Sequence, residues 1–368
     1  MVAAMVIKKL ARMPVELDTL NLFSRLDSEG PADTLINDPA RVQKIMDQLA
    51  AGLKAALNRE STVHGWRAQS LFASLVVALD GCQLMTTIDH GEIWYDGEKV
   101  KPPDYMLVLR NGRRLLVEVK LVPPTHSFNR TVRLSRGELN GLKRFAALFD
   151  AELYIAVFMT PLSSWFLLPA DSFEENGSRY EITIVDMIQF NEMVDLNDVH
   201  LGIEPEIKIT LHVHDDGENK RLEILDTSVG GTTLMKRSEQ QLARFLLTYG
   251  HWESAQETHQ IDKVTTEHTF TAKPEPEAIA AGQGFVAVGV LSTMYSRVFV
   301  GKTTNDDGVV ALGTQVEPGM LSALLDLDYS STTLRLWRLH VSPKSRHTPP
   351  DEPDADEPEV PADKPIDV

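Results

Sequence analysis

Two neighbouring apolar runs, residues 105–109 and 114–121, constrain this chain most, because Asn111-Gly112 lies between them. Asn-Gly between apolar runs is the strongest short-range signal for a β-hairpin, since both residues tolerate a positive φ. The second run reads LLVEVKLV, so Glu118 and Lys120 interrupt an otherwise apolar strand. Ionised side chains in a central strand are costly unless they are paired or bind a metal. An internal ion pair, or an edge strand with one solvated face, would also account for them.

The runs around this hairpin predict a mixed α/β sheet flanked by helices. Helical spacing occurs at 40–60, after Asp38-Pro39, at about 66–79, and within 134–151. Further strands are expected at 92–95, 153–160 and 165–173.

Asp104, Glu118 and Lys120 form the candidate catalytic group. Hydrolysis of a phosphodiester needs a hard cation held by carboxylate oxygens, and Mg²⁺ needs few protein ligands because it keeps several waters. A nearby ammonium can orient the attacking water or stabilise the charge of the transition state. Glu118 and Lys120 lie two positions apart on one strand, so they point to the same face.

The length of the hairpin loop decides whether Asp104 joins them. A two-residue Asn111-Gly112 turn would place Asp104 opposite Val119, on the wrong face. A three-residue loop, 110–112, with Gly112 in the left-handed region, would place Asp104 opposite Glu118. A catalytic role therefore predicts the three-residue loop.

Pro103-Asp104 followed by Glu118-Val119-Lys120 resembles the PD-(D/E)xK motif of the restriction-endonuclease-like superfamily. The resemblance implies that Asp104 and Glu118 bind Mg²⁺ or Mn²⁺ and that Lys120 assists the attacking water. Members of the superfamily often carry a further acid on the helix before the sheet, and here Gln69 takes that place. Gln69 is compatible with a one-metal site, with a substitute acid such as Glu60, or with a weakened domain. It could also be a plain helix-surface residue.

The charge distribution favours a nucleic-acid partner, which we expect to be DNA rather than RNA. The net charge of the chain is −17, but residues 101–144 carry ten basic and three acidic side chains. Candidate phosphate contacts are Arg133, Arg136, Lys143 and Arg144. Solvated ion pairs are the alternative for each of them. The sequence thus predicts a metal-dependent endonuclease in defence, recombination or repair, and the competing interpretation is a catalytically weak, nucleic-acid-binding or scaffold subunit.

The chain divides into four expected regions. Residues 1–60 are helical, 61–200 form the nuclease-like domain, 205–344 form a second α+β region, and the Pro- and acid-rich residues 345–368 are too poor in apolar side chains to fold. In the second region we expect a hairpin at 206–229, a helix at 236–250, a polar connection at 259–278, and strands at 285–291, 297–303, 309–315 and 334–341.

Other sequence features limit where the protein can be located and what it can bind. The lone cysteine, Cys82, excludes an internal disulfide, and no apolar run is long enough to cross a membrane, so a cytoplasmic location is expected. The spacing of His212 and His214 suits a metal, but no third ligand is evident, which favours a solvated strand end. A homo-oligomer and a protein partner bound through the acidic tail are further possibilities.

Overall fold

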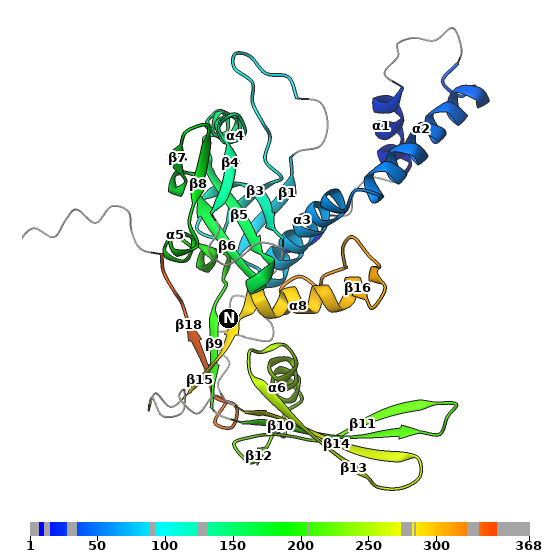
Figure 1. The fold of residues 1–368 in the computed structure, drawn as a ribbon, viewed down its shortest axis with the longest axis vertical. Coiled ribbons are helices and arrows are strands. Elements are labelled where there is room, and N and C mark those ends of the chain that lie inside the picture. Colours follow the sequence, from blue (N-terminus) through cyan, green and yellow to red (C-terminus); the bar gives the residue numbers. More distant parts are fainter. Residues whose placement is uncertain are drawn as a thin grey trace, which may run out of the picture.

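The computed structural model describes residues 7–10, 15–27, 35–88, 93–123, 131–204, 206–273, 282, 285–321 and 331–343 (Figure 1). The predicted acidic tail, 345–368, lies outside the described residues.

A five-stranded mixed sheet forms the centre of the nuclease-like region, with strand order β1-β2-β3-β5-β6. The pair β3 and β5 is parallel, and the other neighbours are antiparallel. The strands are Cys82–Thr87 (β1), Tyr105–Leu109 (β2), Arg114–Val122 (β3), Glu152–Met159 (β5) and Ser164–Pro169 (β6). The helices that flank it are Glu60–Leu79 (α3) and Arg136–Leu148 (α4). This is the mixed α/β architecture that the sequence predicts.

The alternation of side chains along β3 explains why one helix covers each face. Val117 packs in the same buried cluster as Phe72 of α3, whereas Leu116 packs in a second cluster with Leu142 of α4. Both faces of β3 are therefore covered, which is why its sequence is almost continuously apolar.

The hairpin between β2 and β3 has the predicted three-residue loop. The N–H of Leu109 donates to the carbonyl oxygen of Arg113 at 2.9 Å, and Gly112 has a φ of 88°. Tyr105 pairs with Val117, so Asp104, one residue earlier, lies opposite Glu118. A left-handed φ is easy for glycine and costly for other residues, so Gly112 sets the register on which the site depends.

The first strand of the sheet is not where the sequence predicts it. The strand is β1, Cys82–Thr87, whereas residues 93–95 have no regular structure. Since β1 is an edge strand with four exposed side chains among its six residues, it lacks the apolar alternation that marks a half-buried strand. The helix before it, α3, also starts earlier than expected, at Glu60 rather than near Trp66.

The second region is a separate five-stranded antiparallel sheet, of order β12-β11-β10-β14-β13, with a helix, α6, packed on it. Its elements are Ile207–Asp215 (β10), Lys220–Val229 (β11), Thr232–Thr233 (β12), Arg237–Tyr249 (α6), Glu253–Gln260 (β13) and Thr265–Lys273 (β14). The predicted hairpin and helix are confirmed. The prediction of a polar connection at 259–278 is wrong, because most of these residues belong to the β13–β14 hairpin. The sequence of this hairpin is polar, so it lacks the apolar pattern by which a strand is recognised.

Two more expected strands are wrong. Residues 297–303 belong to the helix Leu291–Thr303 (α8), and only Val309 of 309–315 is in a strand, in β17. A short apolar run such as RVFVG fits a buried helix as well as a strand, and packing of α8 against α3 and β6 decides the outcome. The expected strands at 285–291 and 334–341 are confirmed as Val286–Val290 (β15) and Leu336–Leu339 (β18), which flank His200–Ile203 (β9).

The remaining elements are short or lie at the N-terminus. They are the helices Val15–Leu26 (α1), Pro39–Leu57 (α2) and Ile184–Gln189 (α5), the 3₁₀ helices Thr160–Leu162, Ala170–Ser172 and Met193–Leu196, and the strands Val132–Ser135 (β4), Glu174–Asn176 (β7), Arg179–Ile182 (β8), Thr304–Asn305 (β16) and Gly308–Val309 (β17). Helices α1 and α2 extend away from the sheets (Figure 1). The structure describes all of α2, and Ile45 is its only buried residue, so the apolar face expected for this helix is mostly exposed.

The two regions share one hydrophobic core. A single buried cluster runs from Phe72 and Val117 of the first sheet, through Phe299 of α8, to Leu242 of α6. In Figure 1, α8 lies between the upper sheet and α6. Asp198, just before β9, reinforces this junction, because its Oδ1 accepts a hydrogen bond from the N–H of Ser292 at the start of α8, at 2.9 Å.

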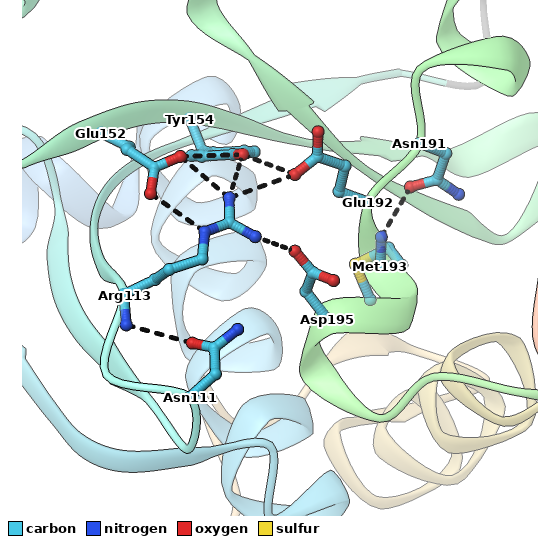
Figure 2. Close-up of polar contacts among 8 residues, drawn as sticks. All are labelled: Asn111, Arg113, Glu152, Tyr154, Asn191, Glu192, Met193 and Asp195. Atoms are coloured by element: carbon cyan, nitrogen blue, oxygen red, sulfur yellow. Dashed lines mark hydrogen bonds and ion pairs between the residues drawn. The ribbon is translucent and has the colours of Figure 1, made fainter. Parts of the chain in front are cut away.

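An arginine-centred network also ties the first sheet to the chain that leaves it (Figure 2). The Arg113 guanidinium donates to both carboxylate oxygens of Glu152 at 2.9 Å and to the hydroxyl of Tyr154 at 2.6 Å. It also pairs with Glu192 at 3.4 Å and with Asp195. Hydrogen bonding to Glu152 raises the pKa of Arg113, although burial opposes this, so the arginine stays charged.

Candidate active site

Asp104 lies immediately before β2 and is 8% exposed. Its Oδ2 accepts a hydrogen bond from the backbone N–H of Val119 at 2.6 Å, and its Oδ1 accepts one from Nε2 of Gln69, also at 2.6 Å. The carboxylate is thereby held between α3 and the middle of β3.

Gln69 reaches the site from α3, as the comparison with the motif predicts. The side-chain amide of Gln69 donates to Asp104, and the backbone carbonyl oxygen of Gln69 accepts a hydrogen bond from the Tyr105 hydroxyl at 3.0 Å. Its alternative interpretation, a plain helix-surface residue, is therefore wrong. The other proposed substitute, Glu60, is nine positions earlier on α3 and contacts His64 at 3.3 Å.

Glu118 and Lys120 lie on the same face of β3 and contact each other. Lys120 Nζ donates to Glu118 Oε1 at 2.8 Å, and Glu118 is only 5% exposed. Lys101 and Glu138, which the sequence analysis did not assign to the site, complete a network of four side chains. Lys101 Nζ is 2.6 Å from Glu118 Oε1 and 2.6 Å from Glu138 Oε1, and Lys120 Nζ is 2.7 Å from Glu138 Oε1.

Local structure explains how Glu138 and Lys101 reach this network. Ser135 caps the N-terminus of α4, with its hydroxyl accepting from the Glu138 N–H at 3.2 Å. The Ser135-x-x-Glu138 spacing is that of a capping box, in which the glutamate would turn back to the cap; here Glu138 turns to the two lysines instead. Lys101 is fixed by its backbone, whose N–H donates to the Gly141 carbonyl oxygen at 3.0 Å. The capping pattern was the only sequence signal that could have identified Glu138.

The contacts within the network favour the charged forms of Lys120 and Glu138. Burial opposes the positive charge of Lys120, but the contacts with Glu118 and Glu138 outweigh it and raise the pKa of Lys120. Burial also opposes the charge of Glu138, but hydrogen bonds from Lys101 and Lys120 outweigh it and lower the pKa of Glu138. Lys120 is therefore suited to stabilise an anion rather than to accept a proton.

The donor set fits a hard divalent cation with few protein ligands. Among the residues that the structure describes, no three His, Cys, Asp or Glu side chains are grouped to hold a metal ion. Asp104 and Glu118 supply two carboxylates from facing register positions, and Gln69 supplies an amide beside Asp104. Two carboxylates suffice for Mg²⁺, which completes its shell with water and phosphate oxygens.

Each of the four candidate phosphate contacts already faces an acidic side chain. Arg133 pairs with Glu181 at 2.7 Å, Arg136 with Glu175, Lys143 with Asp171 at 2.6 Å and Arg144 with Glu98 at 2.9 Å. All four acids come from outside residues 101–144, so the local charge is more balanced than the sequence indicates. The side chains of the four bases are between a third and about half exposed, and exposed pairs of this kind contribute little to stability and exchange readily.

The mixed sheet and the helices that cover it are consistent with the fold of the restriction-endonuclease-like superfamily, as the resemblance predicted. Residues 96–201 match the family model of the archaeal Holliday junction resolvase, Hjc, which belongs to that superfamily. Among solved structures, the chain is similar to Archaeoglobus fulgidus Hjc, a Holliday junction resolvase from an archaeal hyperthermophile. The two share 21% sequence identity over 32% of this chain and 86% of that chain, with a TM-score of 0.26.

No curated protein matches the chain. None of the described helices has the length and apolar character needed to cross a bilayer.

Proposed function

We propose that the PD-(D/E)xK region is a divalent-metal-dependent endonuclease that hydrolyses phosphodiester bonds in DNA. The observation that carries this proposal is the register of the β2–β3 hairpin, which sets Asp104 opposite Glu118 with Lys120 on the same face. The match of residues 96–201 to a resolvase family supports DNA as the substrate and recombination as the setting. Mg²⁺ or Mn²⁺ is the expected ion.

The residues divide the chemistry between them. Asp104 and Glu118 would hold the cation, which when bound lowers the pKa of a water and polarises the scissile phosphate. The Lys120 ammonium orients the attacking water and stabilises the negative charge that grows on the phosphate. Gln69 and the Val119 N–H orient the Asp104 carboxylate. Lys101 and Glu138 position Lys120 and Glu118 through their shared contacts.

The exposed bases Arg133, Arg136, Lys143 and Arg144 are the proposed phosphate contacts. A DNA backbone would replace Glu181, Glu175, Asp171 and Glu98 as their partners. Such contacts make affinity fall as salt rises, because each neutralised phosphate releases counterions.

Cleavage of plasmid and branched DNA, with Mg²⁺ or Mn²⁺ and with EDTA, tests the proposal. We expect metal-dependent cleavage by the wild-type protein and a loss of roughly a hundredfold or more in Asp104→Asn and Lys120→Ala, because removing one electrostatic contributor costs that much in other enzymes. Lys208→Ala, an exposed position on β10, is the matched control and should cleave normally. Cleavage that survives both active-site substitutions would eliminate the assigned site.

A DNA-binding or scaffold subunit with weak catalysis is the second candidate. One observation that favours it is Gln69, an uncharged residue where members of the superfamily often carry an acid. The other is that the ammonium groups of Lys101 and Lys120 both donate to Glu118 Oε1, the oxygen that a cation would need. DNA binding without cleavage under every metal condition would select this alternative.

A further inference from the structure

Three consecutive large apolar side chains lie exposed in the loop between β1 and β2. Trp94 is 88% exposed, Tyr95 is 50% exposed and Ile93 is 38% exposed. Exposed apolar clusters of this kind commonly mark binding surfaces, since leaving them in water is unfavourable. The described part of the loop projects from the nuclease region near α4 (Figure 1).

The base of this loop is fixed beside the active site. Val100 is buried in the cluster below α4, and the guanidinium of Arg144 donates to the Lys99 carbonyl oxygen, at 2.9 Å from Nε. The next residue after Val100 is Lys101, whose ammonium contacts Glu118. The aromatic pair therefore lies six and seven residues before a site residue, on a segment anchored to α4.

The residues around this loop indicate which kind of ligand it would bind. Lys99 and Lys101 lie on the same segment as the aromatic side chains, together with Asp96 and Glu98, and Arg144 holds the base of this segment. The adjoining site is the one proposed to act on a phosphodiester. Aromatic side chains next to basic groups bind nucleic acid by stacking on bases whose faces are open. Paired bases inside a duplex have both faces covered by their neighbours, so stacking requires unpaired nucleotides.

We propose that Trp94 and Tyr95 form a base-stacking subsite, which makes the nuclease prefer DNA with unpaired bases next to a duplex. This inference rests on the proposed function and assigns a specificity role to the loop. Trp94 is the main contact, because it has the larger ring and the greater exposure.

Binding under non-cleaving conditions tests the subsite. The probes are a fluorescein-labelled duplex with a short single-stranded gap and a fully paired duplex of equal length, both in EDTA. For Trp94→Ala we expect a loss of affinity for the gapped DNA of roughly five- to 150-fold, as for other base-stacking residues, with the affinity for paired DNA unchanged. Trp94→Phe should retain most of the binding. The control is Met235→Ala, which removes a side chain that is 85% exposed in the second region.

Equal affinity of Trp94→Ala and wild type for the gapped DNA would overturn the inference, as would an equal loss for both DNAs. A 2-aminopurine placed in the gap adds a direct readout, since stacking on Trp94 should quench its fluorescence in the wild type and not in Trp94→Ala. Cleavage is measured separately. Wild-type cleavage without a Trp94 effect refutes the subsite alone, and Trp94-dependent binding without cleavage refutes the nuclease activity alone.

Discussion

A single amide distinguishes this site from one with three carboxylates. Gln69 donates a hydrogen bond to Asp104 at 2.6 Å without adding charge to the site. A carboxylate at the same place would repel Asp104 until a cation joined them. We therefore expect the identity of residue 69 to balance the stability of the metal-free protein against the affinity of the proposed site for metal.

Gln69→Glu tests this balance. We expect the free energy of unfolding without metal to fall by about 1–2 kcal/mol, because a hydrogen bond is replaced by repulsion between two acids. The Mn²⁺ affinity, measured by calorimetry, should rise by roughly tenfold, since a third carboxylate joins the site. Unchanged Mn²⁺ affinity would show that Gln69 does not face the cation.

At the scale of elements, the β2–β3 loop sets the register that brings the motif together. Gly112→Ala should lower the free energy of unfolding by about 1–2 kcal/mol, because Gly112 has a φ of 88°, where a Cβ is strained. Urea unfolding measures this. Gly52→Ala, in the middle of α2 with open space around it, is the control and should stabilise by about 0.5–1 kcal/mol. A neutral Gly112→Ala would mean that another loop conformation is equally accessible.

The network centred on Arg113, the residue just before β3, joins the β2–β3 loop to β5 and to the segment 191–196 (Figure 2). Arg113→Met should lower the free energy of unfolding by about 2 kcal/mol, because Glu152, Glu192 and Asp195 lose their shared counter-charge. The side chain is 32% exposed, which reduces the effect below that of a fully buried pair. Thermal unfolding should show a much smaller loss for Arg133→Met, whose side chain is 54% exposed. Equal losses for the two variants would contradict a structural role for the network.

At the scale of the whole molecule, the two regions share one buried cluster, so we expect them to unfold as one unit. Asp198 lies at their junction, and burial raises its pKa to about 7, although the hydrogen bonds from Ser292 act in the opposite direction. The folded pKa thus lies above the unfolded value of about 3.9. This contribution to stability is fully present below pH ~3.9 and is lost as the pH rises towards 7.

Asp198→Asn keeps an oxygen to accept the Ser292 N–H and removes the ionisation. At pH 8 we expect the variant to be more stable than the wild type by on the order of 2 kcal/mol, with the positive end of α8 limiting the gain. The difference should shrink as the pH is lowered towards 4. Urea unfolding at pH 8 and pH 5 measures it, and a difference that does not depend on pH would refute the buried, titrating carboxylate.

Local chemistry was enough to predict the centre of the nuclease fold. The Asn-Gly turn, the alternation along β3 and the helical spacing of α4 are properties of short segments, so they are legible in the sequence. The shared face of Glu118 and Lys120 followed from the strand alone. The Asn-Gly pair left two loop lengths open, and the three-residue loop, with Asp104 facing Glu118, was predicted from the catalytic role assigned to Asp104. The position that the motif gave to Gln69, on the helix before the sheet, lies next to Asp104 because α3 packs directly on β3.

Only the tertiary structure identified Lys101 and Glu138 as neighbours of Glu118, and only it paired Arg133, Arg136, Lys143 and Arg144 with acids distant in the sequence. The apolar period of an element shows which face packs, but it does not show which polar side chains of two distant segments meet. For the same reason β1, β13 and β14 escaped prediction: they are edge or polar strands that hydrogen bonding to a neighbour stabilises, with no apolar pattern of their own.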